Sequence, residues 1–166
     1  MADQPSIPRQ PIRAEVAGNK LDVIVTGDAR LHAVLELIAQ AKTSLNVLMY
    51  MFNADEAGDA VRNALDAAAS RGVEVKLLID GFGSNATHPF LEVLKRSGGN
   101  YCVFNPTYGR RYLVRNHQKI IVADERIAII GGANIDETYL TDTGPEHWRD
   151  LWLRIEGPEA AVASRY

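Results

Sequence analysis

The residues whose types and spacing suit chemistry lie in one segment, His117-x-Lys119-x4-Asp124-x6-Gly131-Gly132-x-Asn134. A neutral histidine that faces a phosphate can attack phosphorus and form a covalent phosphohistidine. Lys119 and Asn134 would neutralise and hydrogen-bond the non-bridging oxygens as negative charge develops. Two glycines and an asparagine at fixed offsets make a chance match negligible. The segment therefore predicts a phosphodiester-cleaving site in which His117, Lys119 and Asn134 are catalytic.

Strand geometry accounts for this spacing. Side chains alternate along a strand, so His117 and Lys119 are expected to point to the same face. A two-residue turn at 124–125 then places His117 opposite Gly132. Gly131 and Gly132 are expected to let a substrate approach the backbone at this end of the hairpin.

Two aspartates receive different predicted roles. Asp124 lies five strand steps from Lys119, about 17 Å, so we expect it to hold the turn without touching the reacting phosphate. The attacking nitrogen must be unprotonated, which requires a partner for the other ring N–H. Asp150, at the opening of the last predicted strand, is the candidate for that orienting carboxylate. On spacing alone, a solvated acid at a strand end explains Asp150 equally well.

Further substrate-binding candidates flank the segment. Arg110, Arg111 and Arg115 suit an anionic lipid headgroup or a nucleic-acid backbone. A solvated basic loop explains Arg110 and Arg111 equally well, whereas Arg115 is only two residues before His117. Tyr50 ends a strand on the side where ligands bind in α/β sheets, so it is a candidate wall of the pocket. Burial in the core is the default for an aromatic residue in such a run.

The composition is that of a globular domain. Apolar residues make up 46% of the 166 residues, charged residues 23%, and the net charge is −3. This charge gives no overall basic field for sequence-blind DNA binding. Four scattered histidines and the single Cys102 form no paired metal-binding motif, so we expect no metal and no cofactor. Residues 1–20 are expected to form a flexible arm without a signal peptide, and no stretch is apolar for long enough to span a bilayer.

The rest of the chain, residues 21–166, alternates short β-branched runs with longer helical ones, which predicts an α/β layered domain. Predicted strands cover 21–26, 45–52, 73–79, 100–104, 117–123, 126–132 and 149–155. Predicted helices cover 29–41, with Asp28 as a possible cap, then 53–71, 89–97 and a last one opening at Pro158. Right-handed crossovers would place the first three strands side by side and parallel.

Residues 117–134, HQKIIVADERIAIIGGAN, resemble the HKD motif of the phospholipase D superfamily, whose usual form ends in Gly-Ser-x-Asn or Gly-Gly-x-Asn. The resemblance covers nearly all of residues 21–166, and LNVLMYMF, DGFGS, WRD and IEGP are similar to the first half of bacterial cardiolipin synthases. It implies a phospholipase D-like α/β/α sandwich with a mixed central sheet. It also adds weight to Asp150, which matches the acid that orients the motif histidine.

The chemistry that this resemblance implies is free of metal and cofactor and has two steps. One motif histidine attacks the phosphodiester, the histidine of a second motif protonates the leaving alcohol, and an alcohol or water then accepts the phosphatidyl group. This chain has a single motif. The implied partner is therefore a second HKD motif, from a missing C-terminal half or from a homodimer partner, as in the single-motif nucleases of the superfamily.

The expected function is that of a phosphatidyltransferase or phospholipase D-type half that acts on anionic glycerophospholipids through a phosphohistidine. The resemblance implies a bacterial cytoplasmic protein with peripheral contact to the inner membrane. Two alternatives stay open: a homodimeric nuclease, which the acidic net charge disfavours, and a non-catalytic half domain that binds anionic lipid. Intact His117, Lys119 and Asn134 argue against simple decay of a site.

Overall fold

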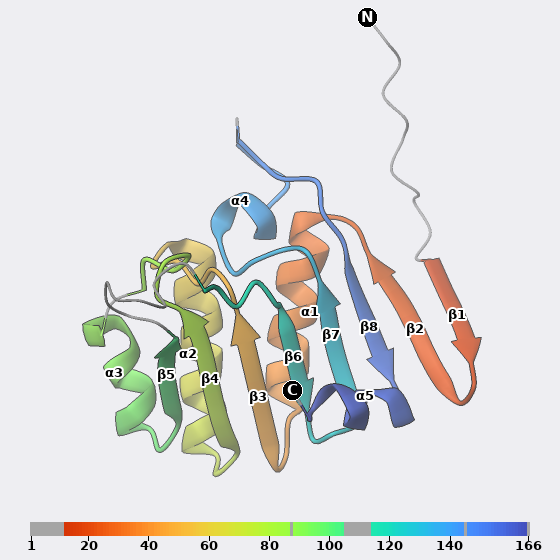
Figure 1. The fold of residues 1–166 in the computed structure, drawn as a ribbon, viewed down its shortest axis with the longest axis horizontal. Helices are drawn as coiled ribbons and strands as arrows, with labels where there is room; N and C mark the ends of the chain where they lie inside the picture. The colour runs from red at the N-terminus through yellow and green to blue at the C-terminus, as the bar shows by residue number, and fades with distance from the viewer. Residues whose placement is uncertain (1–11, 87, 105–113, 145, 166) are drawn as a thin grey trace, which may run out of the picture.

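The computed structural model describes residues 12–86, 88–104, 114–144 and 146–165. Its strands are β1 (Ile12–Val16), β2 (Asn19–Ile24), β3 (Ser44–Met49), β4 (Glu74–Asp80), β5 (Asn100–Phe104), β6 (Ile120–Ala123), β7 (Ile127–Gly131) and β8 (Trp152–Glu156). Its helices are α1 (Gly27–Gln40), α2 (Glu56–Ser70), α3 (His88–Arg96), α4 (Glu137–Leu140) and α5 (Pro158–Ala163). The strands form one mixed sheet in the order β1-β2-β8-β7-β6-β3-β4-β5, which confirms the predicted α/β class (Figure 1).

The predicted neighbourhood of the first strands is wrong in one respect. The strands β3, β4 and β5 are adjacent and parallel. The strand predicted at 21–26, however, is β2, which pairs antiparallel with β8 and is separated from β3 by three strands. The second half of the chain inserts β6, β7 and β8 between them, and the alternation of local elements carries no information about such an insertion.

Residues 12–20 do not form the expected flexible arm. They form β1, the turn and the start of β2, paired from Ile12↔Val23 to Val16↔Asn19. Ala17 and Gly18 make the turn with φ of 49° and 78°. The remainder of the predicted arm, residues 1–11, lies outside the described residues.

The β6–β7 hairpin is one residue out of the predicted register. Ile120 pairs with Ile130 and Ala123 with Ile127, so three residues connect the strands. Strand β6 begins at Ile120, and His117 therefore lies in the segment before the strand. The expected strand alternation consequently does not extend to His117, and other contacts must place its ring.

The helix α1 begins at a different cap from the one predicted. The Thr26 hydroxyl accepts a hydrogen bond from the Ala29 N–H, whereas Asp28 lies within the first turn. The helix α2 begins after Asp55, whose carboxylate accepts from the Gly58 N–H at 2.8 Å.

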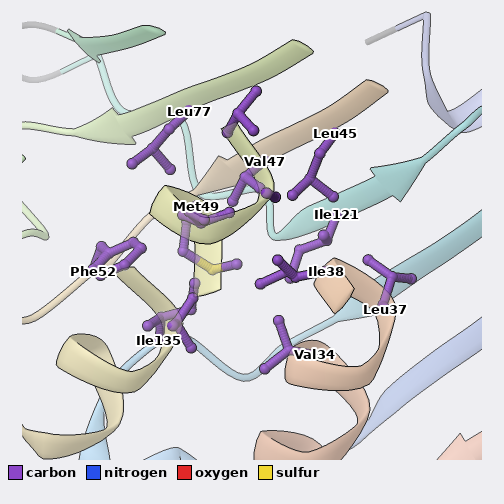
Figure 2. Packing of buried hydrophobic residues seen from close by; sticks show 14 of the residues in the cluster. Val34, Leu37, Ile38, Leu45, Val47, Met49, Phe52, Leu77, Ile121 and Ile135 are labelled. Atoms are coloured by element: carbon purple, nitrogen blue, oxygen red, sulfur yellow. The ribbon is translucent and has the colours of Figure 1, made fainter. Parts of the chain in front are cut away.

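The main core lies between one face of the sheet and the helices α1, α2 and α3. Alternate residues of β3 are buried against the apolar stripe of α1, as Figure 2 shows. The labelled members are Val34, Leu37, Ile38, Leu45, Val47, Met49, Phe52, Leu77, Ile121 and Ile135. A smaller cluster lies under α5 on the other face and contains Val122, Ala128, Ile155 and Ala160.

One edge of the sheet collects the segments that hold the predicted site residues, together with the turn after β4. The strands β3, β4 and β7 end at this edge, and the antiparallel β6 and β8 begin there (Figure 1). It therefore gathers the segments 50–53, 80–84, 114–119, 131–136 and 146–151. Among the described residues, no helix is long and apolar enough to cross a membrane.

Candidate active site

The His117 ring lies between a cation and an aromatic ring. The Nζ atom of Lys119 is 3.0 Å from Nδ1 and 3.2 Å from Nε2 of His117, and 2.9 Å from its carbonyl oxygen. The Tyr50 ring packs against the imidazole with centroids 4.4 Å apart and planes at 50°. His117 is exposed, whereas Lys119 is only 5% exposed. The structure thus brings three predicted site residues together, with the imidazole accessible.

The electrostatics favour a neutral His117 ring. Burial lowers its pKa, the Lys119 charge lowers it further, and the Asp80 carboxylate opposes both effects. Burial also lowers the pKa of Lys119, and Asp150 opposes that shift. Since a nucleophilic nitrogen must be unprotonated, these surroundings suit an attacking histidine.

Asn134 lies at the same edge and contacts the segment that follows β3. Its side chain is 3% exposed, and Oδ1 accepts a hydrogen bond from the Met51 N–H at 3.2 Å. The Ile135 N–H donates to the Met51 carbonyl at 3.1 Å, which joins the segment after β7 to the segment after β3. Met51 follows Tyr50 directly, so one short stretch contacts both Asn134 and His117. The carboxamide oxygen is engaged with backbone, and its N–H groups are the donors that an amide brings to a phosphate.

Asp150 lies near Lys119 without touching His117. Its Oδ1 accepts from the Leu151 N–H at 2.6 Å, and within the described part of the chain no hydrogen bond joins it to the His117 ring. Its charge raises the pKa of Lys119 against the effect of burial. The predicted orienting contact is therefore not present in this structure, and Asp150 acts on the cation beside the ring.

The two motif glycines lie close to the segment that leads into β8. A Cβ on Gly132 would lie 2.5 Å from Oδ1 and 2.7 Å from Oδ2 of Asp150. A Cβ on Gly131 would lie 2.3 Å from the Leu151 carbonyl oxygen and 2.8 Å from the Trp152 ring. Both glycines therefore make room for the segment that leads into β8.

Arg115 lies at the same edge as His117. Its guanidinium packs 4.6 Å from the centroid of the Phe82 ring, in the turn after β4, and Nη1 donates to the Val114 carbonyl at 3.2 Å. Arg110 and Arg111 lie outside the described residues.

Asp124 lies at the opposite edge, in the β6–β7 turn. Its carboxylate accepts hydrogen bonds from the backbone N–H groups of Lys42, Thr43 and Ser44 and from the Thr43 hydroxyl. Burial alone would raise the pKa of Asp124, but these donors lower it to about 2. Asp124 thus ties the hairpin to the loop before β3, which accounts for a structural role in the motif.

The sequence reasoning did not identify several buried charged residues, among them Arg30 and Asp80. Arg30 is 1% exposed, and its guanidinium donates to the carbonyls of Tyr139, Val25, Asp150 and Trp148. Its position in the apolar stripe of α1, four residues before Val34, was the available signal. Asp80, also 1% exposed, is the last residue of β4. Within the described part of the chain, no group of three or more His, Cys, Asp or Glu is arranged to hold a metal ion.

The mixed sheet and the cluster at its edge define the phospholipase D class of fold. The phospholipase D family member Nuc from Salmonella typhimurium is similar in structure, with a TM-score of 0.64 and 27% sequence identity over 87% of this chain and 90% of that one. The chain belongs to the family described as cardiolipin synthase, PLD-like domain, which matches residues 34–164.

Curated relatives in this family are cardiolipin synthases. A cardiolipin synthase of Clostridium perfringens is 33% identical over 144 residues, which are 84% of this chain and 30% of the relative. Cardiolipin synthase B of Salmonella typhimurium is 35% identical over 150 residues, or 87% of this chain and 36% of the relative. The chain thus spans about a third of the length of the curated relatives that it matches.

Proposed function

We propose that this chain is one catalytic half of a phosphodiester-transferring enzyme that acts on anionic glycerophospholipids and forms a phosphohistidine at His117. The observation that carries the proposal is the exposed His117 ring held against the buried Lys119 ammonium. The identity of 33% and 35% to cardiolipin synthases supports a phosphatidyl substrate.

In the first step, a ring nitrogen of His117 attacks phosphorus. The P–N bond forms while the P–O bond to the leaving alcohol breaks, and a histidine from a second motif supplies the proton that the alcohol takes. Lys119 and Asn134 bind the non-bridging oxygens, whose negative charge they stabilise most strongly in the transition state.

In the second step, an acceptor alcohol or water attacks phosphorus and the P–N bond breaks. The acceptor's proton passes to the second histidine, which restores both histidines. Glycerophospholipid acceptors would give a phosphatidyltransferase, and water would give a phospholipase. Neither step calls on a metal ion, so turnover is expected to survive excess EDTA.

A substrate comparison tests the proposal. Phosphatidylglycerol vesicles and single-stranded DNA are offered to the wild type, to His117→Ala and to His32→Ala. His32 is an exposed histidine of α1, 3.9 Å from Glu36, and serves as the matched control. Once a second motif completes the site, glycerol release that disappears only in His117→Ala is expected, whereas DNA cleavage without glycerol release contradicts the lipid substrate.

The second motif is proposed to come from another phospholipase D-like domain, either elsewhere in a longer polypeptide or in a second copy. Light scattering after size exclusion separates these cases for this chain. A dimer allows two His117 rings to complete one site, whereas a monomer is expected to be inactive until a second domain is supplied.

A homodimeric nuclease is the alternative function. One observation favours it: Nuc matches this chain over 90% of its own length, so a protein of one such domain shares the fold. The net charge of −3 weighs against a nucleic-acid substrate.

With a lipid substrate, peripheral attachment to the inner face of a bacterial membrane is the location we propose.

A further inference from the structure

Asp80 is a buried acid whose partners are backbone N–H groups. Its Oδ1 accepts from Phe82 at 2.9 Å and from Gly83 at 3.3 Å, which closes the turn after β4. Its Oδ2 accepts from the N–H of Asn116 at 3.1 Å, across 36 residues of chain. The carboxylate therefore joins the turn after β4 to the residue immediately before His117.

Asn116 also binds the backbone on the other side of His117. Its side-chain oxygen accepts a hydrogen bond from the Gln118 N–H at 3.2 Å. The N–H groups on both sides of His117 are therefore fixed: that of Asn116 donates to Asp80, and that of Gln118 donates to the Asn116 side chain. Because β6 begins only at Ile120, these bonds replace the strand pairing that would otherwise fix the His117 backbone.

The same turn also supports the ring beside the imidazole. A Cβ on Gly83 would lie 2.5 Å from the Tyr50 carbonyl oxygen and 2.8 Å from Cζ of its ring. The Ser84 hydroxyl donates to the Tyr50 carbonyl at 3.2 Å. Tyr50 in turn packs against His117 at 4.4 Å. The turn closed by Asp80 therefore contacts both the backbone segment before His117 and the aromatic wall of its ring.

We propose that Asp80 is the positioning residue of this half-site: its carboxylate locks the turn after β4 to Asn116 and so fixes His117 for attack. The consequence for rate rests on the proposed function, whereas the anchoring itself does not. Preorganisation of this kind matters because misplacement of a catalytic group by about 1 Å can cost about 100-fold in rate.

The charges that face His117 make this role measurable. Lys119 lowers the pKa of His117 and Asp80 raises it, while Asp150, before β8, acts on Lys119. Tyr50, directly after β3, is the aromatic neighbour of the His117 ring. Loss of the Asp80 charge should therefore lower the pKa of His117 further, which loss of fold stability alone would not do.

Two variants separate charge from geometry. Asp80→Asn removes the charge and presents an amide N–H₂ to one of the N–H donors, so both the pKa of His117 and kcat are expected to fall. Asp80→Glu keeps the charge but misplaces it, so the pKa of His117 stays closer to the wild-type value while kcat falls. The loss of kcat is expected to be roughly 10- to 100-fold with KM changed little. Asp124→Asn, at the opposite edge, is the matched control and should change neither quantity.

The pKa of His117 is measured by NMR titration of the full chain, which requires no substrate. A fall in Asp80→Asn with none in Asp124→Asn supports the proposal, even if neither lipid nor DNA proves to be a substrate. In that case the proposed function fails and the positioning role stands. An unchanged pKa together with unchanged kcat in Asp80→Asn overturns the proposal.

Hydrogen exchange of the wild type covers the case in which Asp80→Asn does not fold. The Asn116 amide is expected to exchange more slowly than that of an unbonded loop residue because it donates to a buried carboxylate. Exchange at the rate of an unstructured chain would show that the anchor does not exist and would also overturn the proposal.

Discussion

The Nζ atom of Lys119 lies within 3.2 Å of both ring nitrogens of His117. A buried cation at this position repels a second positive charge, so it disfavours the imidazolium form. The same ammonium is available to a phosphate oxygen once a substrate approaches the exposed ring. We therefore propose two functions for Lys119: it keeps the histidine neutral and it binds the group that the histidine attacks.

The first prediction concerns pH. Because burial and Lys119 lower the pKa of His117 from 6.5, the acid limb of kcat/KM should lie below pH 6.5, with activity rising as the ring loses its proton. Lys119→Met removes the repelling charge and should raise the pKa of His117 while lowering activity. NMR titration and a pH–rate profile measure both effects. A His117 pKa above 6.5 in the wild type, or a lower His117 pKa in Lys119→Met, contradicts this account.

The second prediction separates Asp124 from the chemistry. Removing the carboxylate in Asp124→Ala leaves three N–H groups without their acceptor and should cost about 1–2 kcal/mol in the free energy of unfolding at pH 7. The kcat of a folded, completed site should not change. Glu74→Ala, which removes an exposed ion pair with Lys76, is the control and should cost about 0.5 kcal/mol or less.

The pH dependence of this stabilisation follows from the depressed pKa of Asp124, which is about 2 in the folded state against an ordinary 3.8. The contribution is fully present above about pH 4 and is lost as the pH falls towards 2. Urea unfolding of the wild type and Asp124→Ala across this range measures it. The difference in the free energy of unfolding between the wild type and Asp124→Ala should shrink as the pH falls. A difference that grows would contradict the assignment.

Local pattern predicted the bounds of two parallel strands closely, although β5 is the outer strand of the sheet and β4 has exposed residues on one face. The run at 100–104 is β5 with the predicted ends, and 73–79 differs from β4 by one residue. Apolar runs between turn residues carry this information. The order of strands was not available from pattern, because the insertion of β6, β7 and β8 beside β2 depends on pairings between distant segments.

The candidate site was predictable in its members and less so in its contacts. The structure brings His117, Lys119 and Tyr50 together, although burial in the core was the default expectation for Tyr50. Asp80 was missed because its partners are backbone N–H groups, one of them 36 residues away, and such bonds leave no mark in side-chain spacing. The close approach of Asp150 to Gly132 could not be predicted either, because the two residues lie in different segments of the chain.

The third prediction uses that close approach. A Cβ at residue 132 would lie 2.5 Å from the Asp150 carboxylate, so Gly132→Ala should destabilise the fold by about 1–3 kcal/mol through overpacking. In the Asp150→Ala background the clash is absent, and the same substitution should cost clearly less. Urea unfolding of the four proteins in this cycle gives the coupling between the two residues. Strict additivity would mean that something other than Asp150 occupies the space.

The fourth prediction concerns Arg30, whose guanidinium binds carbonyls from separate segments, including Tyr139, Trp148 and Asp150. Arg30→Met fills similar space but leaves these buried acceptors unpaired, so it should cost about 3 kcal/mol or more in the free energy of unfolding. Arg30→Lys should retain only part of this stabilisation, because one ammonium group cannot reproduce the planar set of donors of a guanidinium.

Arg71 provides the matched control for Arg30. It also donates to backbone carbonyls, those of Ile38 and Ala39, but it is exposed, so water replaces its bonds. Arg71→Met should therefore cost no more than about 0.5–1 kcal/mol. Equal losses for the two methionine variants would show that burial of the Arg30 acceptors is not the cause. A larger loss in Arg30→Met, accompanied by faster amide exchange at 148–151, would establish that α1 holds the segment that brings Asp150 beside Lys119.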